Sequence, residues 1–371
     1  MKLNPFRIEE YYAKYEFSVQ YMLSSSDAQS RKLVDLFEWE PTARKKLDDL
    51  WLGYTEAAGA PYLRETISTL YQKTRADDVL VTAAAEEAIF ITYHALISSE
   101  DHVIVETPCY ESALELARST GATVSEWERY FEDSWANDFD SLIKLIRPNT
   151  KFIYINTPSN PTGTLMDKDV FVKLMALAEE QNIIVFCDEV YRELEHDPAA
   201  RLPAAADLYS NAISLGSMSK SYGLPGLRLG WMICRNPEVI KKLMNFKLYT
   251  SICNSAPSEF MSDLALRHRD KLIERNLNIL HHNLPLMKDF MVRHSNIFSW
   301  VEPQASPIGF PRVNVSEDIM HWCEKIAHEV GILLLPGSVY DQPRHIRISY
   351  GRSDMPEALH LLDNYLNQLA K

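Results

Sequence analysis

Cysteine is scarce in this sequence, and its few cysteines are not arranged as a framework. The 371 residues contain five cysteines, an odd number with no paired spacing. We therefore expect neither a disulfide scaffold nor a zinc site, and a reducing compartment fits this usage. His281 and His282 are adjacent and lack the i, i+4 spacing of two ligands on one helix face, so no metal site is predicted.

Long apolar runs and an excess of positive charge are also missing. No stretch is long and apolar enough to span a bilayer, and residues 1–17 contain no apolar core of signal-peptide length. Lys and Arg total 38 against 51 Asp and Glu, a formal net charge of −13. Nucleic acids and anionic membranes need clustered Lys and Arg. We expect a cytoplasmic protein that binds neither, although a local basic pocket is compatible with this charge.

The apolar content and its spacing predict a large folded α/β protein. Hydrophobic residues make up 46% of the chain, and no internal repeat is visible. Between about residues 50 and 250, helical segments alternate with apolar runs of strand length at 79–82, 102–106, 152–156, 183–187, 212–215 and 230–234. Such alternation predicts a mostly parallel sheet with helices on both faces.

The pattern changes after Pro257. Residues 258–294 read as helices, residues 300–315 have strand character interrupted by prolines, and a helix around 319–329 precedes apolar runs at 332–335 and 345–350. Residues 8–22 also have helical character. We expect a large domain at 40–257 and a smaller α+β domain formed by 1–39 and 258–371.

One lysine stands in an unusual setting. Lys220 lies in SLGSMSKSYGLPGLRLGW, residues 214–231, between two serines and before a Gly-Leu-Pro-Gly turn and Arg228. Burial and a nearby cation lower a lysine's pKa and leave more free amine to attack a carbonyl. Pyridoxal phosphate, held as a Schiff base, is the cofactor that most often meets such a lysine. A phosphate-binding P-loop is rejected because the glycine before the lysine is missing; a surface loop with a chance lysine is the alternative.

Further candidates follow the predicted strands. Asp188 ends one apolar run, where a pyridine nitrogen that must stay protonated would explain a buried carboxylate. Tyr110 comes just after another run, where ligands of open α/β sheets bind and where its ring could stack on a planar cofactor. The small residues at 83–85 open a helix that could cradle a phosphate, although an ordinary helix start is a serious alternative. Asn160, before a proline, could be a plain turn residue.

Two more positions suggest ligand contacts. Arg347 alternates with Ile346 and Ile348, so its side chain points opposite to theirs. An inward-facing arginine is costly unless it meets an anion, and a carboxylate bound bidentately is the best match. Tyr54 precedes a glycine-rich turn and either presents its hydroxyl to a ligand or packs. The aromatic N-terminal segment is either an arm packed on another domain or the border of a substrate pocket.

Five motifs in a fixed order resemble the class I/II aminotransferases, pyridoxal-phosphate enzymes of fold type I. They are GAPYLR at 59–64, SNPTG at 159–163, DEVY at 188–191, SMSKSYGLPGLRLG at 217–230 and RIS at 347–349. The resemblance runs from about Tyr54 to the C-terminus. It implies a mostly parallel seven-stranded sheet flanked by helices, a smaller α+β domain, and a homodimer with shared active sites.

The resemblance also implies roles around the cofactor ring. Lys220 would hold the cofactor as an aldimine and then move a proton between the substrate Cα and the cofactor. Asp188 would keep the pyridine nitrogen protonated, Tyr191 and Asn160 would hydrogen-bond the ring oxygen, and Tyr110 would stack on the ring. The catalytic set is thus Lys220, Asp188 and Tyr191.

The remaining implied contacts concern the phosphate and the substrate. Arg347, with Asn160, would bind the substrate carboxylate, and Tyr54 would reach the phosphate of the neighbouring subunit. The other phosphate contacts would come from Ala84, Ala85, Ser217 and Arg228. The family usually has Ser or Gly in the stretch at Ala83–Ala84, so here phosphate binding would rest more on backbone N–H groups, Ser217 and Arg228.

The N-terminal stretch NPFRIEEYYAKYEF, followed by SSSDAQ, resembles capreomycidine synthase and related arginine-modifying pyridoxal-phosphate enzymes. The leading hypothesis is an aminotransferase that moves the amino group of an L-amino acid to a 2-oxo acid. The alternative is a cyclase, lyase or oxidase that acts on an amino acid such as an arginine derivative. A non-enzymatic ligand sensor is disfavoured by the intact motif set. The amino donor and acceptor cannot be read from the sequence.

Overall fold

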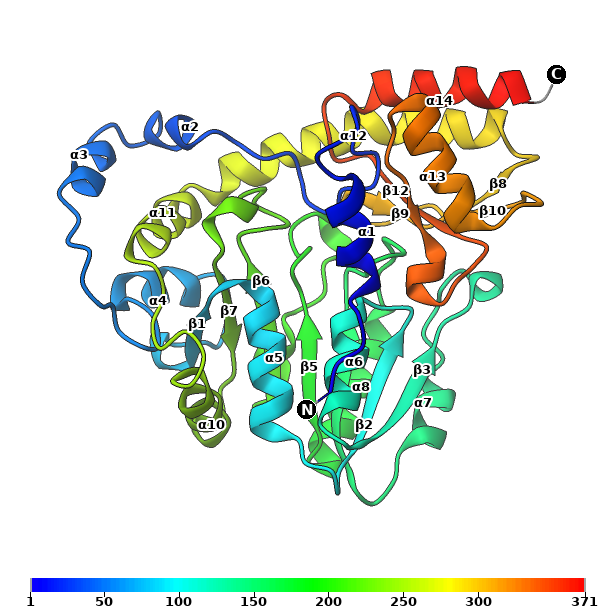
Figure 1. The fold of residues 1–371 in the computed structure, drawn as a ribbon. Helices are drawn as coiled ribbons and strands as arrows, with labels where there is room; N and C mark the ends of the chain where they lie inside the picture. Colours follow the sequence, from blue (N-terminus) through cyan, green and yellow to red (C-terminus); the bar gives the residue numbers. More distant parts are fainter. Residues whose placement is uncertain (1, 370–371) are drawn as a thin grey trace.

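A seven-stranded sheet forms the centre of the computed structural model, which describes residues 2–369 (Figure 1). Its strand order is β1-β7-β6-β5-β4-β2-β3. Strands β2 to β6 are parallel, and β7 runs antiparallel to its neighbours β6 and β1. The mostly parallel sheet is therefore confirmed. The strands are β1 (Val79–Thr82), β2 (His102–Thr107), β3 (Thr123–Glu128), β4 (Thr150–Asn156), β5 (Ile184–Asp188), β6 (Ala212–Ser217) and β7 (Gly230–Ile233).

Strand β3 was not among the six apolar runs that the sequence predicted. It lies at the sheet edge and pairs only with β2. Of its six side chains only Trp127 is buried. An edge strand needs no continuous apolar run because water reaches its polar side chains, so the periodicity argument missed it.

Helices cover both faces of the sheet, as the apolar strands require (Figure 1). One face packs against α5 (Ala84–Leu96), α6 (Glu111–Ser119) and α10 (Pro237–Lys247). The other packs against α7 (Phe139–Leu145), α8 (Lys168–Gln181) and α9 (Ala205–Leu208). Strand β4 illustrates the division, since Phe152 and Tyr154 belong to the first core cluster, while Ile153 and Ile155 belong to the second.

The part of the chain before β1, residues 2–78, contributes short helices. They are α1 (Arg7–Tyr15), α2 (Leu33–Phe37), α3 (Ala43–Asp48) and α4 (Pro61–Ser68). Leu63 and Ile67 of α4 are buried and anchor this helix on the core. The helix expected over 8–22 ends at Tyr15, because Gln20 and Tyr21 instead donate backbone hydrogen bonds to Gly331 O, both 3.0 Å long.

The chain after β7 builds a second packed unit together with α1. Its elements are α11 (Ala256–Arg267), α12 (Arg269–Arg293), β8 (Phe298–Ser299), β9 (Ile308–Gly309), β10 (Arg312–Val313), α13 (Ile319–Val330), β11 (Leu335–Pro336), β12 (Ile346–Ser349) and α14 (Met355–Leu369). One apolar cluster joins Ile8, Tyr11 and Tyr15 of α1 to Trp322 of α13 and Leu362 of α14. The boundaries at 39/40 and 257/258 stay predictions. Within residues 2–369, no helix is long and apolar enough to cross a membrane.

Candidate active site

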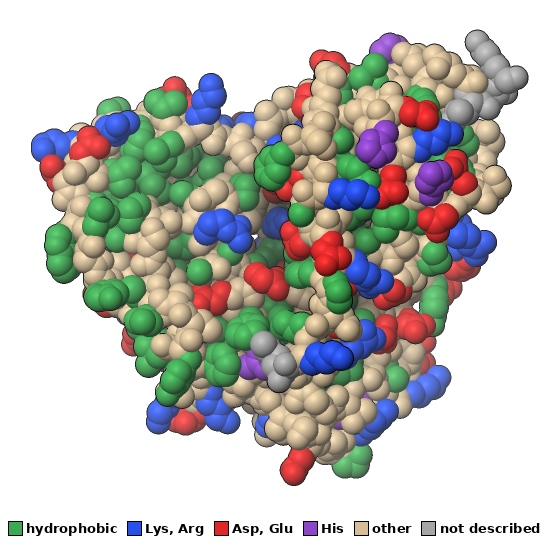
Figure 2. All heavy atoms as spheres, in the orientation of Figure 1, with side chains coloured by type: hydrophobic (Ala, Val, Ile, Leu, Met, Phe, Trp, Pro, Cys, Tyr) green, Lys and Arg blue, Asp and Glu red, His purple; other side chains and the backbone are tan. Residues whose placement is uncertain are grey.

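A cavity of about 480 Å³ lies at the carboxyl ends of the central strands. Asn156, Asp188 and Ser217 end β4, β5 and β6, and all three line it. This is the edge at which ligands of open α/β sheets bind. Helix α1 and the segment after it form the opposite wall, so the cavity lies between the two packed units. Figure 2 shows a hollow there with acidic side chains around its rim.

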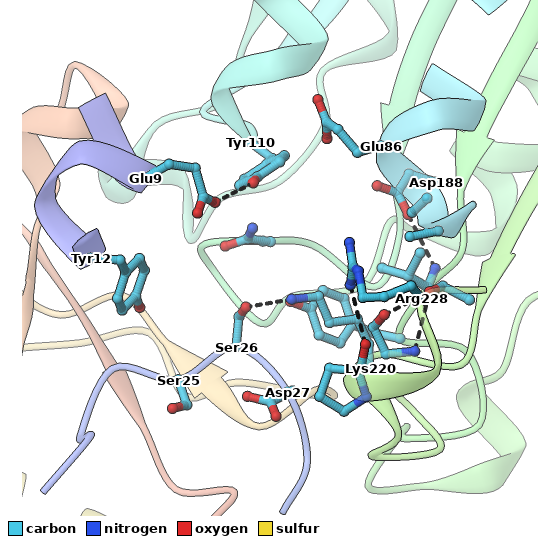
Figure 3. A pocket seen from close by; sticks show the side chains of 18 of the residues that line it. Glu9, Tyr12, Ser25, Ser26, Asp27, Glu86, Tyr110, Asp188, Lys220 and Arg228 are labelled. Atoms are coloured by element: carbon cyan, nitrogen blue, oxygen red, sulfur yellow. Dashed lines mark hydrogen bonds between the residues drawn. The ribbon is translucent and has the colours of Figure 1, made fainter. Parts of the chain in front are cut away.

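Lys220 points into this cavity from the turn after β6 (Figure 3). Its Nζ donates a hydrogen bond to Ser26 Oγ at 2.7 Å. Burial lowers the pKa of Lys220, and the positive charge of Arg347 lowers it further, whereas Asp27 and Asp188 raise it. The lysine therefore carries more free amine than a solvated lysine does, as the sequence predicts.

Asp188 presents a buried carboxylate to the same cavity. Its two oxygens accept hydrogen bonds from Val190 N and Tyr154 Oη, each 3.1 Å long. Burial raises the pKa of Asp188 to about 6, although these hydrogen bonds and Lys220 oppose the rise. A protonated pyridine nitrogen is the partner that would stabilise such a carboxylate.

Tyr191 and Asn160 stand beside this carboxylate as further cavity-lining polar groups. The buried Tyr191 hydroxyl has no hydrogen-bond partner of good geometry among residues 2–369, although Ser26 lies near enough to oppose the rise that burial causes in its pKa. Asn160 Oδ1 accepts from Arg347 Nη1 at 3.0 Å and from Tyr340 Oη at 3.1 Å. An unpartnered buried hydroxyl costs free energy, so Tyr191 fits a bound group with an acceptor or donor at that place.

The N-terminus of α5 closes one end of the cavity with Ala84, Ala85, Ser217 and Arg228 in its lining. The first N–H groups of a helix lack intrahelical partners and attract a phosphate. Gly230 lets the chain come close here, because a Cβ on it would lie 2.8 Å from the carbonyl carbon of Ala84. The guanidinium and the helix end are a suitable cradle for a phosphate group.

Two predicted residues do not line the cavity. Arg347 is buried behind it and is linked to it through Asn160 and Tyr12, since Nη2 donates to Tyr12 Oη at 2.6 Å. Tyr54 is 87% exposed and lies outside the cavity altogether. The structure therefore brings together every predicted site residue except Tyr54. Arg347 belongs to this group but is separated from the cavity by one side chain.

The comparisons with known proteins agree with this geometry. The family model of aminotransferases of class I and II matches residues 25–363. The chain belongs to this family. A crystal structure of a PLP-dependent aminotransferase from Streptococcus suis is similar with a TM-score of 0.94 and 30% identity, over 99% of both chains. Membership of the class I and II aminotransferases confirms the predicted α/β fold of type I and establishes pyridoxal 5′-phosphate as the cofactor.

Relatives within and beside the aminotransferases differ in their reactions. Capreomycidine synthase from Streptomyces vinaceus is 26% identical over 345 residues, 92% of this chain and 88% of that protein. An aspartate aminotransferase from Pyrococcus horikoshii is 28% identical over 327 residues, 84% and 82% of the two chains. The structure of a PLP-dependent cyclase, OrfR, shares the fold with a TM-score of 0.90 at 24% identity, over 99% of this chain and 98% of that one.

Several cavity residues of this aminotransferase-family chain were missed by sequence reasoning. Ser26 and Glu9 come from the N-terminal segment, and Glu86 comes from the first turn of α5. Tyr154, in the middle of β4, was also missed; it donates to Asp188 without lining the cavity. The run Ser24-Ser25-Ser26-Asp27 entered the sequence analysis only within the resemblance to capreomycidine synthase, with no role for Ser26. Its distance of almost 200 residues from Lys220 hid the contact, which needs the tertiary structure.

Proposed function

We propose that this chain is a pyridoxal-phosphate-dependent aminotransferase that moves the amino group of an L-amino acid to a 2-oxo acid, with Lys220 as the cofactor lysine. The observation that carries the proposal is the placement of the Lys220 amine and the Asp188 carboxylate in one cavity at the strand ends. The cofactor supplies an electron-withdrawing ring conjugated to the substrate nitrogen. The unpartnered Tyr191 hydroxyl and the helix end at Ala84 fit that group.

The side chains around the ring would have separate tasks. Lys220 takes up the proton that leaves the substrate Cα and later returns one, which a partly neutral amine can do. Asp188 accepts a hydrogen bond from the ring nitrogen and keeps it protonated. Tyr191 and Asn160 hydrogen-bond the ring oxygen, and Tyr110 packs on the ring face and excludes water.

The ends of the cavity would bind the charged groups. Ser217, Arg228 and the N–H groups of Ala84 and Ala85 hold the phosphate. Arg347 with Asn160 binds the substrate carboxylate after it exchanges some of its present partners, among them the Tyr12 hydroxyl. Tyr54 of a second copy completes the phosphate site in a homodimer.

A second candidate, a cyclase, lyase or oxidase acting on a cationic amino acid such as an arginine derivative, is favoured by the charge of the cavity wall. Glu9 and Tyr12 of α1 line it, together with Glu16, which directly follows the helix. They follow one another at intervals of three and four, which places them on one side of this helical segment. Neither Glu9 nor Glu16 forms a salt bridge with a basic side chain in residues 2–369. Burial raises the pKa of Glu16, Glu9 and Asp27 add to the rise, and Arg352, which also lines the cavity, opposes it. A substrate cation would relieve this repulsion.

The similarity to capreomycidine synthase over 92% of the chain supports this second candidate too. Both candidates begin with the same proton removal from Cα. They differ in the next step: the aminotransferase transfers the amino group, whereas the second candidate eliminates, cyclises or oxidises the substrate. The cavity wall that carries Glu9 and Glu16 favours a basic substrate side chain in either reaction. It disfavours a substrate with a second carboxylate, such as aspartate.

Product analysis separates the two. Holoenzyme is incubated with arginine, hydroxyarginine, ornithine, aspartate or phenylalanine and with 2-oxoglutarate, and the products are identified by mass spectrometry. Equal amounts of oxo acid and glutamate support the aminotransferase, and a cyclised or dehydrated product without glutamate contradicts it. Lys220→Ala is the inactive control.

The acidic wall is tested with matched substrates. Glu9→Gln with Glu16→Gln should lower kcat/KM for a guanidinium substrate about tenfold but leave its uncharged isostere, which carries a urea group, unchanged. Equal losses for both substrates would contradict a charge-based role of these carboxylates.

A further inference from the structure

Ser26 lies opposite the reactive lysine, in the segment that joins α1 to α2. Its Oγ accepts a hydrogen bond from Lys220 Nζ at 2.7 Å (Figure 3). Ser26 also lines the cavity, so its hydroxyl lies at the cavity surface and not in the packed core. None of the five motifs that resemble the aminotransferases includes this residue.

Charged side chains hold the segment on both sides of Ser26. Arg347 donates to Ser24 O from Nε at 3.2 Å and from Nη2 at 3.0 Å. Arg352 Nη2 donates to Ser25 Oγ and to Asp27 Oδ1, both at 3.0 Å. Since each neighbour of Ser26 has its own partner, the Ser26 hydroxyl is the one that this stretch turns toward the lysine.

Backbone contacts fix the same segment against the lysine turn. Ala28 N donates to Lys220 O at 3.4 Å, and Gln29 N donates to Gly351 O at 3.1 Å. Gly223, at φ +65°, lets the two chains approach, because a Cβ there would lie 2.9 Å from Gln29 O. The backbones that carry Ser26 and Lys220 are therefore held together, and the contact between their side chains is built into the fold.

The surroundings of the Lys220 nitrogen act on its charge in both directions. Burial and Arg347 favour the neutral amine, whereas Asp27, Asp188 and Glu9 favour the ammonium. A hydrogen bond at the nitrogen itself then has a large influence on its protonation. A serine hydroxyl accepts from an amine or ammonium N–H and can donate to a nitrogen lone pair, so it suits either state.

We propose that Ser26 is a positioning residue for Lys220, whose hydroxyl holds and orients the amine while it exchanges a proton with the substrate. The role rests on the proposed function, in which Lys220 is the cofactor lysine. The hydrogen bond to Ser26 fixes the orientation of the Lys220 amine in the cavity whenever the amine is not bound to the cofactor. Without the hydroxyl, the amine loses its only side-chain hydrogen-bond partner among the described residues.

The test measures the protonation of Lys220 in the apoprotein. Competitive acetylation at a series of pH values, followed by peptide mass spectrometry, gives the titration midpoint of Lys220, with the exposed Lys45 as internal reference. Ser26→Ala removes an acceptor that favours the ammonium more than the amine, so the midpoint should fall by about one pH unit. Ser26→Thr keeps the hydroxyl and should restore it. Ser18→Ala, at an exposed serine of the segment between α1 and α2 that does not line the cavity, is the matched control and should leave the midpoint unchanged.

The holoenzyme supplies a second readout. Ser26→Ala should lower kcat about tenfold with KM for the amino acid changed less than twofold, and Ser26→Thr should recover most of kcat. An unchanged Lys220 midpoint in Ser26→Ala overturns the role of Ser26, even if Lys220 binds the cofactor. Absence of the cofactor from Lys220 overturns the proposed function instead, and the apoprotein titration distinguishes the two failures. If Ser26→Ala does not fold, Ser26→Cys, with its weak acceptor, should give an intermediate fall, and no fall contradicts the proposal.

Discussion

Asp188 carries a carboxylate that the protein alone stabilises poorly. Burial raises its pKa from 3.8 to about 6, so the folded apoprotein bears an unfavourable charge above that pH. The folded state holds the proton more tightly than the unfolded chain does. The resulting destabilisation is absent below about pH 4, grows as the pH rises, and is complete above about pH 6.

Asp188→Asn should therefore have opposite effects on stability and catalysis. The free energy of unfolding of the apoprotein should rise by about 1–3 kcal/mol at pH 8 and be unchanged near pH 4. Turnover should fall roughly a hundredfold or more, because the ring nitrogen loses its anionic partner. Denaturant titration at the two pH values and steady-state kinetics measure both. A variant that is less stable at pH 8 and fully active would contradict this role.

Glu86 is a second buried carboxylate, and its environment implies that it affects phosphate binding in a pH-dependent way. It lines the cavity in the first turn of α5, accepts from Ser112 Oγ at 3.1 Å, and burial raises its pKa to about 7. Above pH 7 its charge should repel a phosphate at the helix end. Relative to wild type, Glu86→Gln should bind a cofactor analogue without the aldehyde equally well below pH 6 and about tenfold more tightly at pH 8.5. Isothermal calorimetry gives the ratio, and a ratio that does not change with pH would contradict the expectation.

The sequence predicted the site residues that stand in a setting where an ordinary structural role is hard to find. A lysine among small residues, an aspartate at the end of an apolar strand and an arginine between isoleucines each implied a partner. Ser26 and Glu9 have many ordinary uses, and their positions in the cavity depend on how the N-terminal segment packs against the rest of the chain. No local pattern contains that information.

Helix α5 begins with a conformation that its sequence does not favour. Ala84 has φ +69°, a region that costs a residue with a Cβ about 1–2 kcal/mol. The family resemblance places Ser or Gly in this stretch, and the backbone supplies the reason for a glycine. Alanine in place of the family's usual Ser or Gly therefore removes a hydroxyl group and also leaves the start of helix α5 strained.

Ala84→Gly should therefore raise the free energy of unfolding of the apoprotein by about 1 kcal/mol. Ala85→Gly, one residue later within the helix, should lower it by about 1 kcal/mol because glycine disfavours helix. Chemical denaturation of both variants is the measurement. A decrease for both would show that Ala84 is not strained in solution.

The sheet also shows which elements a sequence can predict. In the five central strands and β1, every residue except the half-buried Lys151 of β4 is buried, so apolar runs identify them. The two-residue strands β9 and β10 lie in the region where prolines interrupt the pattern, β8 lies just before it, and their pairing is set by the surrounding packing. Short pairings of this kind have no periodicity long enough to detect.

Over the whole molecule, an exposed apolar surface suggests a second copy. Trp51, Leu52 and Tyr54 are at least 77% exposed, and Tyr249 is 83% exposed. The two segments are neighbours, because Thr55 Oγ1 donates to Asn254 O at 3.3 Å. Such a patch is typical of an interface. Figure 2 shows many apolar side chains on the flank that carries α4 and α10.

We expect a homodimer that this surface holds together and in which Tyr54 contributes to the partner's phosphate site. Trp51→Glu with Tyr249→Glu should shift the protein toward monomer in sedimentation velocity and weaken cofactor binding in parallel. Phe17→Glu, at a residue 93% exposed elsewhere, should leave both unchanged. A wild-type protein that sediments as a monomer with full activity would contradict the shared site.

The central claim is that the cofactor is bound covalently at one lysine. Holoenzyme is reduced with borohydride and digested, and the modified peptide is identified by mass spectrometry. We predict a single pyridoxyl group on Lys220, in a peptide from the segment 214–231, and none after reduction of Lys220→Ala. A pyridoxyl group on another lysine, or no labelled peptide, would contradict the account.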